Sequence, residues 1–143
     1  MEIRRYRLPF HWTAAFPADW THEYDAESDQ NLFYPADSDL TFRLTAFHAE
    51  KAGVPAPASV METVFAKTAP ENSTVINIPE LIVPGCTVLI RGRKYQEEGQ
   101  TVSHICAGCI CEGELLTVNI FGTDARQVYE ALAYLTLIAR EAS

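Results

Sequence analysis

The stretch "CTVLIRGRKYQEEGQTVSHICAGCICEGELLTVNIFG", residues 86–122, decides the fold. Its runs of apolar and β-branched residues are interrupted twice, by the short polar sequences "EEG" and "EG". Such runs predict strands, and glycine in a connection this short predicts a tight turn between neighbouring strands. The stretch therefore predicts an antiparallel meander of three strands.

A two-residue turn at Glu112 and Gly113 sets the register of the last two strands. The pairs are then Cys111 with Glu114, Cys109 with Leu116, Ala107 with Val118 and Ile105 with Ile120. Because directly opposed side chains share a face, one face is apolar throughout and is expected to lie under a helix. His104, Cys106 and Asn119 fall on the other face.

The N-terminal third of the chain predicts further strands. Residues 3–16 are β-branched and aromatic without helical spacing, which predicts one or two edge strands. Residues 31–47 alternate with a period of two on either side of a turn around Pro35, as strands do. The acidic residues between Asp19 and Asp39 are expected to form a hydrated loop, because runs of like charge usually lie on the surface.

Two helices are predicted. The first follows Pro57, ends near Pro70 and has apolar residues at helical spacing: Val60, Met61, Val64 and Phe65. The second begins at Asp124, whose side chain can cap the first turn with Gln127 three residues later. Its apolar stripe is expected to comprise Val128, Leu132, Leu135 and Ala139.

The order of these elements predicts an α+β fold, in which a short central helix and a long C-terminal helix pack against an antiparallel β-sheet. Residues 71–85 are apolar but broken by proline, so a connection with a short edge strand is expected there. Residues 1–143 are expected to form a single domain, because a chain of this length builds one core.

The chain is acidic, with 19 Asp and Glu against 11 Lys and Arg and a formal net charge of -8. Binding to nucleic acid depends on clustered cations that displace counterions from phosphates, so no nucleic-acid partner is expected. No run approaches the roughly 18 apolar residues of a membrane-spanning helix, and the N-terminal segment carries no apolar run of secretory length. We therefore expect a cytoplasmic protein without membrane contact, whose thiols are reduced.

His104, Cys106, Cys109 and Cys111 suggest a metal site or a thiol-dependent enzyme. A zinc site needs its ligands to converge on one point, whereas a regular strand places Cys106 and Cys109 on opposite faces. A bulge at Gly108 would reverse this and reopen the metal hypothesis. A redox "CAGC" motif is disfavoured because such motifs work at a helix N-terminus. Structural cysteines, with no metal, cofactor or catalytic residue, are the expectation.

Cys86 adds an open question of register. A four-residue turn over residues 97–100 opposes Cys86 to Cys111, whereas a three-residue turn opposes it to Ile110. A cross-strand disulfide is conceivable only in the first register, and a reducing compartment disfavours it.

The N-terminal third is also rich in aromatic residues. Packing in the core is one interpretation. The other is a hydrophobic groove rimmed by acidic side chains, which would accept an apolar or cationic segment of another protein. In that interpretation the candidate binding residues are Trp12, Trp20, Phe33 and Tyr34.

The layout resembles the PsbP-like fold, which is shared by the lumenal photosystem II subunit, a eukaryotic Ran-binding import factor and the bacterial DcrB-like proteins. The resemblance rests on "FPADW" (16–20), the strand "LTFRLTAF" (40–47), the helix around Met61, the meander and the helix from Asp124. It implies a non-enzymatic domain that binds other proteins, in some bacterial members as a type VI secretion chaperone that shelters hydrophobic effector segments. It transfers no functional residue.

Together these features predict a cytosolic bacterial protein-binding domain without catalytic activity, acting as an adaptor, a secretion chaperone or a toxin-neutralising partner. Two alternatives remain open. One is a small metal- or thiol-dependent enzyme centred on residues 104–111. The other is a small-ligand carrier with a cavity between sheet and helix.

Overall fold

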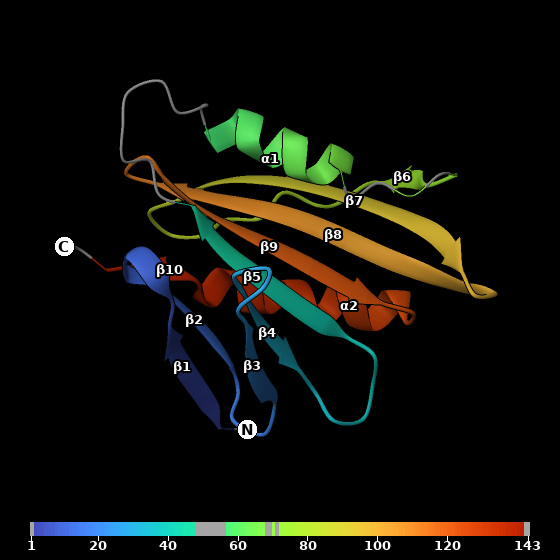
Figure 1. Ribbon diagram of the computed structural model, residues 1–143, viewed down its shortest axis with the longest axis horizontal. Helices are drawn as coiled ribbons and strands as arrows, with labels where there is room; N and C mark the ends of the chain where they lie inside the picture. The colour runs from blue at the N-terminus through green and yellow to red at the C-terminus, as the bar shows by residue number, and fades with distance from the viewer. Residues whose placement is uncertain (1, 48–56, 68–69, 71, 142–143) are drawn as a thin grey trace.

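The computed structural model describes residues 2–47, 57–67, 70 and 72–141. The strands in this part of the chain form two antiparallel sheets (Figure 1). The large sheet comprises, in spatial order, β3 (Thr21–Asp25), β4 (Gln30–Tyr34), β5 (Thr41–Phe47), β9 (Glu114–Gly122), β8 (Gln100–Cys111), β7 (Thr87–Glu97) and β6 (Thr74–Ile76). The small sheet comprises β1 (Ile3–Arg7), β2 (Trp12–Pro17) and β10 (Ala139–Arg140), with a single 3₁₀ turn over Pro9–His11 between β1 and β2.

The meander predicted from residues 86–122 is strands β7, β8 and β9. The register of β8 and β9 is as predicted, from Cys111 opposite Glu114 to Ile105 opposite Ile120. Both connections are two-residue turns with positive φ at both positions, 50° and 80° at Glu98 and Gly99 and 52° and 80° at Glu112 and Gly113. These values match a type I′ turn, whose twist suits a β-hairpin.

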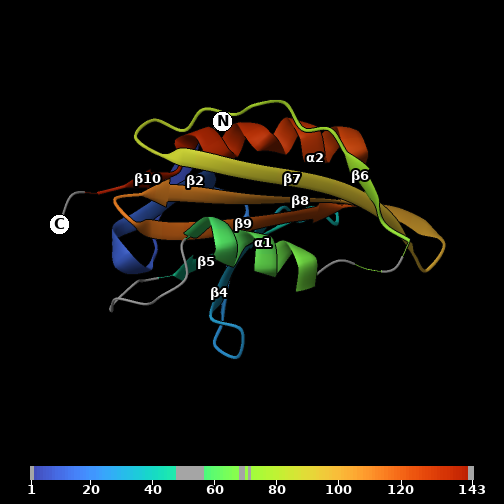
Figure 2. The ribbon, with the colours of Figure 1, turned by 90° about the horizontal axis from the view of Figure 1, so that it is seen from above.

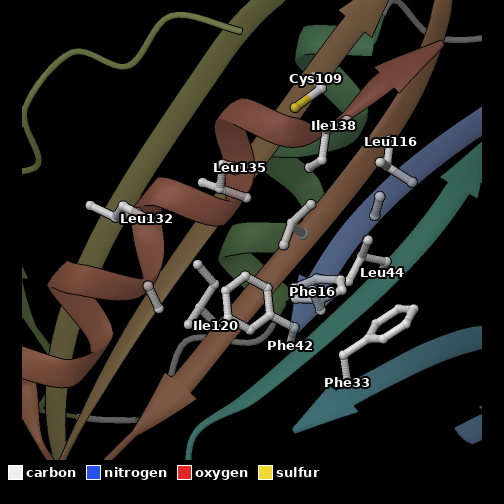
Figure 3. Close-up of a cluster of buried hydrophobic side chains, with 14 of the residues drawn as sticks. Phe16, Phe33, Phe42, Leu44, Cys109, Leu116, Ile120, Leu132, Leu135 and Ile138 are labelled. Atoms are coloured by element: carbon white, nitrogen blue, oxygen red, sulfur yellow. The ribbon is translucent and has the colours of Figure 1, made fainter. Parts of the chain in front are cut away.

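The apolar face of the meander forms the floor of the hydrophobic core (Figure 3). Helix α2 (Ala125–Ala131) and the 3₁₀ segment η2 (Leu132–Leu137) lie over it, and the small sheet closes the same side through Phe16 of β2. Phe16 stacks on Phe33 with ring centroids 4.3 Å apart and meets Phe42 edge-on at 4.9 Å. Each such buried aromatic or aliphatic side chain contributes about 1.5–3 kcal/mol of transfer free energy.

The opposite face of the large sheet is covered in part by α1 (Pro57–Lys67), so that α1 and α2 lie on either side of the sheet (Figure 2). We call the face under α1 the outer face and the face under α2 the inner face. The central helix is therefore present as predicted, and the ring of Phe65 stacks on His104 at 6.3 Å. The structure does not describe the side chains of Val60, Met61 and Val64, which were predicted to form the apolar stripe of this helix. Strands β8 and β9 are thus buried on both faces.

The C-terminal helical segment is present as predicted and runs from Ala125 to Leu137, but only its first part is α-helical. Asp124 caps it as predicted, accepting a hydrogen bond of 3.2 Å from the backbone N–H of Gln127. The α-helical part ends at Ala131, and the chain then tightens into η2. Ala139 is not on the helical stripe, because it pairs with Thr13 as part of strand β10.

The acidic region was predicted to be a loop, and this also needs correction. Residues 21–34 form the β3–β4 hairpin at one edge of the large sheet. An edge strand tolerates charge because it has solvent on one side. The predicted edge strands are confirmed by β1 and β6, whereas β2 is the central strand of the small sheet.

Candidate functional site

An open pocket of about 520 Å³ lies beside the β7–β8 hairpin on the outer face of the large sheet. We call it the hairpin pocket. Its walls come from the hairpin, from the start of β5 and from the end of β9. The charged and aromatic residues that line it are Asp39, Arg43, Tyr95, Glu97, Glu98 and Phe121. The volume is in the range of small-molecule and side-chain binding sites.

The hairpin pocket is negatively charged. Among the described residues that line it, Asp39, Glu97 and Glu98 are acidic and Arg43 is basic. The Asp39 carboxylate is held in place by Thr123, whose hydroxyl donates to Oδ2 at 2.5 Å and whose backbone N–H donates to Oδ1 at 3.1 Å. These hydrogen bonds lower the pKa of Asp39, so the carboxylate stays charged even in mild acid.

Aromatic side chains provide the apolar part of the hairpin pocket. Phe121 is stacked almost parallel on the His104 ring, at 4.2 Å between centroids and 4° between planes. Burial, together with the charge of Glu97, raises the pKa of the Tyr95 phenol, which therefore remains neutral at physiological pH. Aromatic faces next to carboxylates are a suitable environment for an organic cation.

A buried polar network holds the His104 ring on which Phe121 stacks. Arg93 Nε donates to His104 Nδ1 at 3.0 Å, so the opposite ring nitrogen carries the proton and Nε2–H donates to Asn119 Oδ1 at 2.7 Å. All three side chains are buried. Burial is the main reason that the pKa of His104 falls to about 4, which keeps the imidazole neutral at pH 7.

Arg93 also ties α1 to the outer face. Its Nη1 donates to the backbone carbonyl of Phe65 at 2.9 Å, and the guanidinium carbon lies 4.4 Å from the centre of the Phe65 ring. A guanidinium over an aromatic face gains electrostatic energy that increases when water is excluded. Burial lowers the pKa of Arg93, although not enough to discharge a guanidinium.

The cysteine-rich strand is regular at Gly108. This residue is paired with Leu89 on one side and Thr117 on the other, in an unbroken register on both sides. The bulge that would bring Cys106 and Cys109 together is therefore not formed. No group of three or more His, Cys, Asp or Glu side chains suited to a metal ion occurs among the described residues.

The buried thiols are poor nucleophiles. Burial raises the pKa of Cys106 to about 11 and that of Cys109 to about 12. Because the thiolate is the reactive form, such groups react slowly at neutral pH. The buried His104 and these two thiols therefore do not form a catalytic set.

The four aromatic residues predicted to bind a partner do not form one surface. Trp12 and Phe33 are each 0% exposed, which places them in the core. Trp20 is half-buried and stacks on Phe16 at 5.5 Å. Tyr34 is half-buried, and its hydroxyl donates to Glu23 Oε1 at 2.6 Å. The single aromatic groove is therefore not supported, and binding roles for Trp20 and Tyr34 remain predictions.

The hairpin pocket was not predicted from the sequence. The period-two pattern of β5 and β9 places Thr41, Arg43 and Phe121 on the outer face, alternating with core residues. The pattern does not show that this part of the face forms a pocket. Tyr95 and Glu97 could be added to the same face only once the register of β7 against β8 was known.

Among the described residues, no helix combines the length and apolar character needed to cross a bilayer.

Comparisons with known proteins identify the fold. No protein-family model and no curated protein sequence matches the chain. Among solved structures, a Bacteroides thetaiotaomicron protein superimposes with a TM-score of 0.71 at 14% identity, over 100% of this chain and 50% of that one. This chain thus spans about half the length of that protein.

Two further solved structures cover most of both chains. The cyanobacterial PsbP protein (CyanoP) of Synechocystis gives a TM-score of 0.64 at 13% identity, over 97% of this chain and 92% of that one. LpqN, a protein involved in cell envelope biogenesis of Mycobacterium tuberculosis, gives 0.53 at 15% identity, over 95% and 89%. At these identities the likeness concerns the fold alone, and kinship with DcrB-like or Ran-binding proteins stays a prediction. The chain has a PsbP-like fold.

Proposed function

We propose that this chain is a non-catalytic protein-binding domain of the bacterial cytoplasm that holds a basic segment of a partner protein in the hairpin pocket. The observation that carries the proposal is the composition of that pocket, whose lining combines three carboxylate residues with the aromatic residues Tyr95 and Phe121. A lysine or arginine side chain matches both features, because it binds carboxylates through its charge and aromatic faces through cation–π contact.

The chemistry of the remaining polar groups supports a binding role over catalysis. A general base must reach its substrate, whereas His104 is 0% exposed and has both ring nitrogens in hydrogen bonds. A nucleophilic cysteine needs a lowered pKa, whereas those of Cys106 and Cys109 are raised. The acidic surface also disfavours nucleic acid and anionic lipid as partners.

The pocket is open enough for a side chain that remains attached to a protein. A volume of about 520 Å³ holds one long cationic side chain and part of the flanking backbone. Asp39 is fixed by Thr123, so no rotamer has to be ordered at that carboxylate when the cation binds.

The test uses a fluorescent peptide of alternating lysine and alanine, with the same peptide carrying glutamate in place of lysine as its control. We expect the basic peptide alone to bind, and the double substitution Glu97→Gln and Glu98→Gln to weaken it about tenfold through loss of two charges. The matched control is Glu80→Gln with Glu141→Gln, which changes the net charge equally on exposed residues outside the pocket.

Equal weakening by both double variants would show that only net charge matters and would refute the pocket. Thermal melting of each variant establishes that it is folded. Binding of the acidic control peptide with similar affinity would refute the proposed charge preference.

A small-ligand carrier is the second candidate, and the same observation of an open pocket with aromatic and charged walls favours it. Native mass spectrometry distinguishes the two. A carrier retains a small molecule through gentle purification and loses it in the Glu97→Gln and Glu98→Gln variant, whereas a peptide-binding domain is purified empty.

A further inference from the structure

We propose that Cys86 and Cys111 form a redox modification site, which closes to a reversible disulfide when the protein meets a hydroperoxide. The proposal is independent of the hairpin pocket. Both residues lie at the other end of the β7–β8 pair, where β7 begins and β8 ends.

The strand register brings the two cysteines together. At that end, the final pair of the β7–β8 ladder is Thr87 with Ile110. One step further along an antiparallel pair, Cys86 stands opposite Cys111 on the same face. This register follows from the turn over residues 97–100, because Glu97 pairs with Gln100 and only Glu98 and Gly99 lie between them.

The hydrogen-bonding phase of β8 makes this a favourable position for a disulfide. In a hairpin with a two-residue turn, the residues that close the turn exchange backbone hydrogen bonds. Gln100 therefore directs its backbone groups toward β7, and Cys111, which closes the turn with Glu114, directs its own toward β9. The Cys86 N–H agrees with this phase, because it donates to the Val83 carbonyl at 3.0 Å.

Cys86 and Cys111 are thus a non-hydrogen-bonded pair. In such pairs the Cα atoms lie about 4.5 Å apart and the side chains are closer than in the alternate pairs. Disulfides bridge Cα atoms that are about 4.4–6.8 Å apart. The backbone therefore needs little adjustment for an S–S bond at this position.

The two thiols are also the accessible ones. Cys86 and Cys111 are half-buried, whereas Cys106 and Cys109 are 0% exposed. Burial, together with the neighbouring thiol of Cys111, raises the pKa of the Cys86 thiol. Cys109 lies on the same face but opposes Val88 in the core, so an oxidant reaches it last.

The chemistry balances with a hydroperoxide as the oxidant. The thiolate of one cysteine attacks a peroxide oxygen, the O–O bond breaks, and the products are a sulfenic acid and water or an alcohol. The second thiolate then attacks the sulfenic sulfur, the S–S bond forms, and hydroxide leaves as water after taking up a proton. Two thiols lose two electrons and two protons in total, and the peroxide is reduced.

The test treats the reduced full-length chain with about one equivalent of hydrogen peroxide and measures its intact mass. We expect a loss of about 2 Da per chain, restored by dithiothreitol, and a higher melting temperature in the oxidised form. Trypsin should then release residues 68–91 joined to residues 95–126, and fragmentation should place the bond on Cys111.

Variants make the assignment specific. Cys86→Ser and Cys111→Ser should each abolish the mass loss, whereas Cys106→Ala and Cys109→Ala should retain it. The peptide map of the wild type does not depend on the folding of any variant. A disulfide between chains, a bond to Cys109, or a gain of oxygen without a cross-link would each overturn the proposal.

Discussion

Nε of Arg93 donates a hydrogen bond of 3.0 Å to Nδ1 of His104, and both side chains are buried on the face that α1 covers. This contact fixes the tautomer of His104, because Nδ1 must remain an acceptor. A second proton could be added at Nδ1 only if Arg93 moved away. Stability should therefore depend on pH through this residue.

Acid should unfold the protein through His104. Its pKa is about 4 in the folded state against an ordinary value of 6.5, so the unfolded chain binds more protons between these values. The stabilising effect is complete above pH 6.5 and is lost as the pH falls toward 4, by about 3 kcal/mol in all. Urea titrations of the wild type between pH 7.5 and 4.5 measure it.

The variant His104→Gln should be less stable at pH 7.5 but should show a flatter pH profile, because the titrating group is gone. Asn119→Ala is the control. It removes a hydrogen bond that raises the pKa of His104, so the variant should keep a steep profile while losing stability. Parallel profiles for the wild type and His104→Gln would contradict the assignment.

Replacing the turn residue Glu98 with asparagine should stabilise the protein. Its φ of 50° is left-handed, a region that asparagine adopts more readily than glutamate, and Asn-Gly is the preferred type I′ sequence. Glu98→Asn should therefore raise the free energy of unfolding by about 0.5–1 kcal/mol, measured by urea denaturation.

Glu112 is the matched position in the second turn, with a φ of 52°. Its carboxylate Oε2 lies 3.0 Å from Nη1 of Arg140, whose side chain is only 10% exposed. Glu112→Asn gains in the turn but leaves Arg140 without this partner, so its net effect should be smaller than that of Glu98→Asn. A larger gain at Glu112 would show that the ion pair contributes nothing.

Gly92 should not tolerate a side chain. A Cβ atom there would lie 2.6 Å from Cδ1 of Ile78 and 2.8 Å from Cγ1 of Ile76. Gly92→Ala should destabilise the protein by about 1–3 kcal/mol, as overpacking does. Adding Ile78→Ala makes room, so the double variant should lose less stability than the sum of the two single variants. Additive losses would place the strain elsewhere.

Thiol labelling should separate the four cysteines into two classes. Cys86 and Cys111 should react with an aromatic disulfide reagent in the native protein, and Cys106 and Cys109 only after denaturation. The raised pKa values of the buried pair, about 11 and 12, point to rates on the order of a hundredfold lower. The number of fast thiols should be unchanged in Cys106→Ala.

Much of the meander could be predicted from the sequence. The two-residue turn at Glu112 and Gly113 admits one register, and a shift by one residue would turn Ile105, Ala107 and Cys109 out of the core. The order of the elements also predicted the PsbP-like fold that the structural comparisons support.

The polar network could not be predicted, because it depends on the register that the sequence left open. A turn one residue shorter opposes Arg93 to Ser103, whereas the observed turn opposes it to His104. The sequence placed His104 and Asn119 on one face but did not indicate that a buried arginine would join them.

Tertiary contacts also determine which aromatic residues are buried and where the C-terminal helix ends. An aromatic side chain has the same period-two position whether its face is exposed or covered, so sequence could not show that β2 buries Trp12 or that Phe16 covers Phe33. Ala139 leaves the helical stripe because Thr13 offers a strand partner that is distant in sequence.

The burial of Trp12 gives the protein an internal optical reporter. The chain has two tryptophans, and both lie where the small sheet meets the large one: Trp12 fully enclosed on β2, and Trp20 stacked on Phe16. Their emission will shift to longer wavelength when the small sheet separates. The outer face carries no indole among the described residues, so movement of α1 will leave the spectrum largely unchanged.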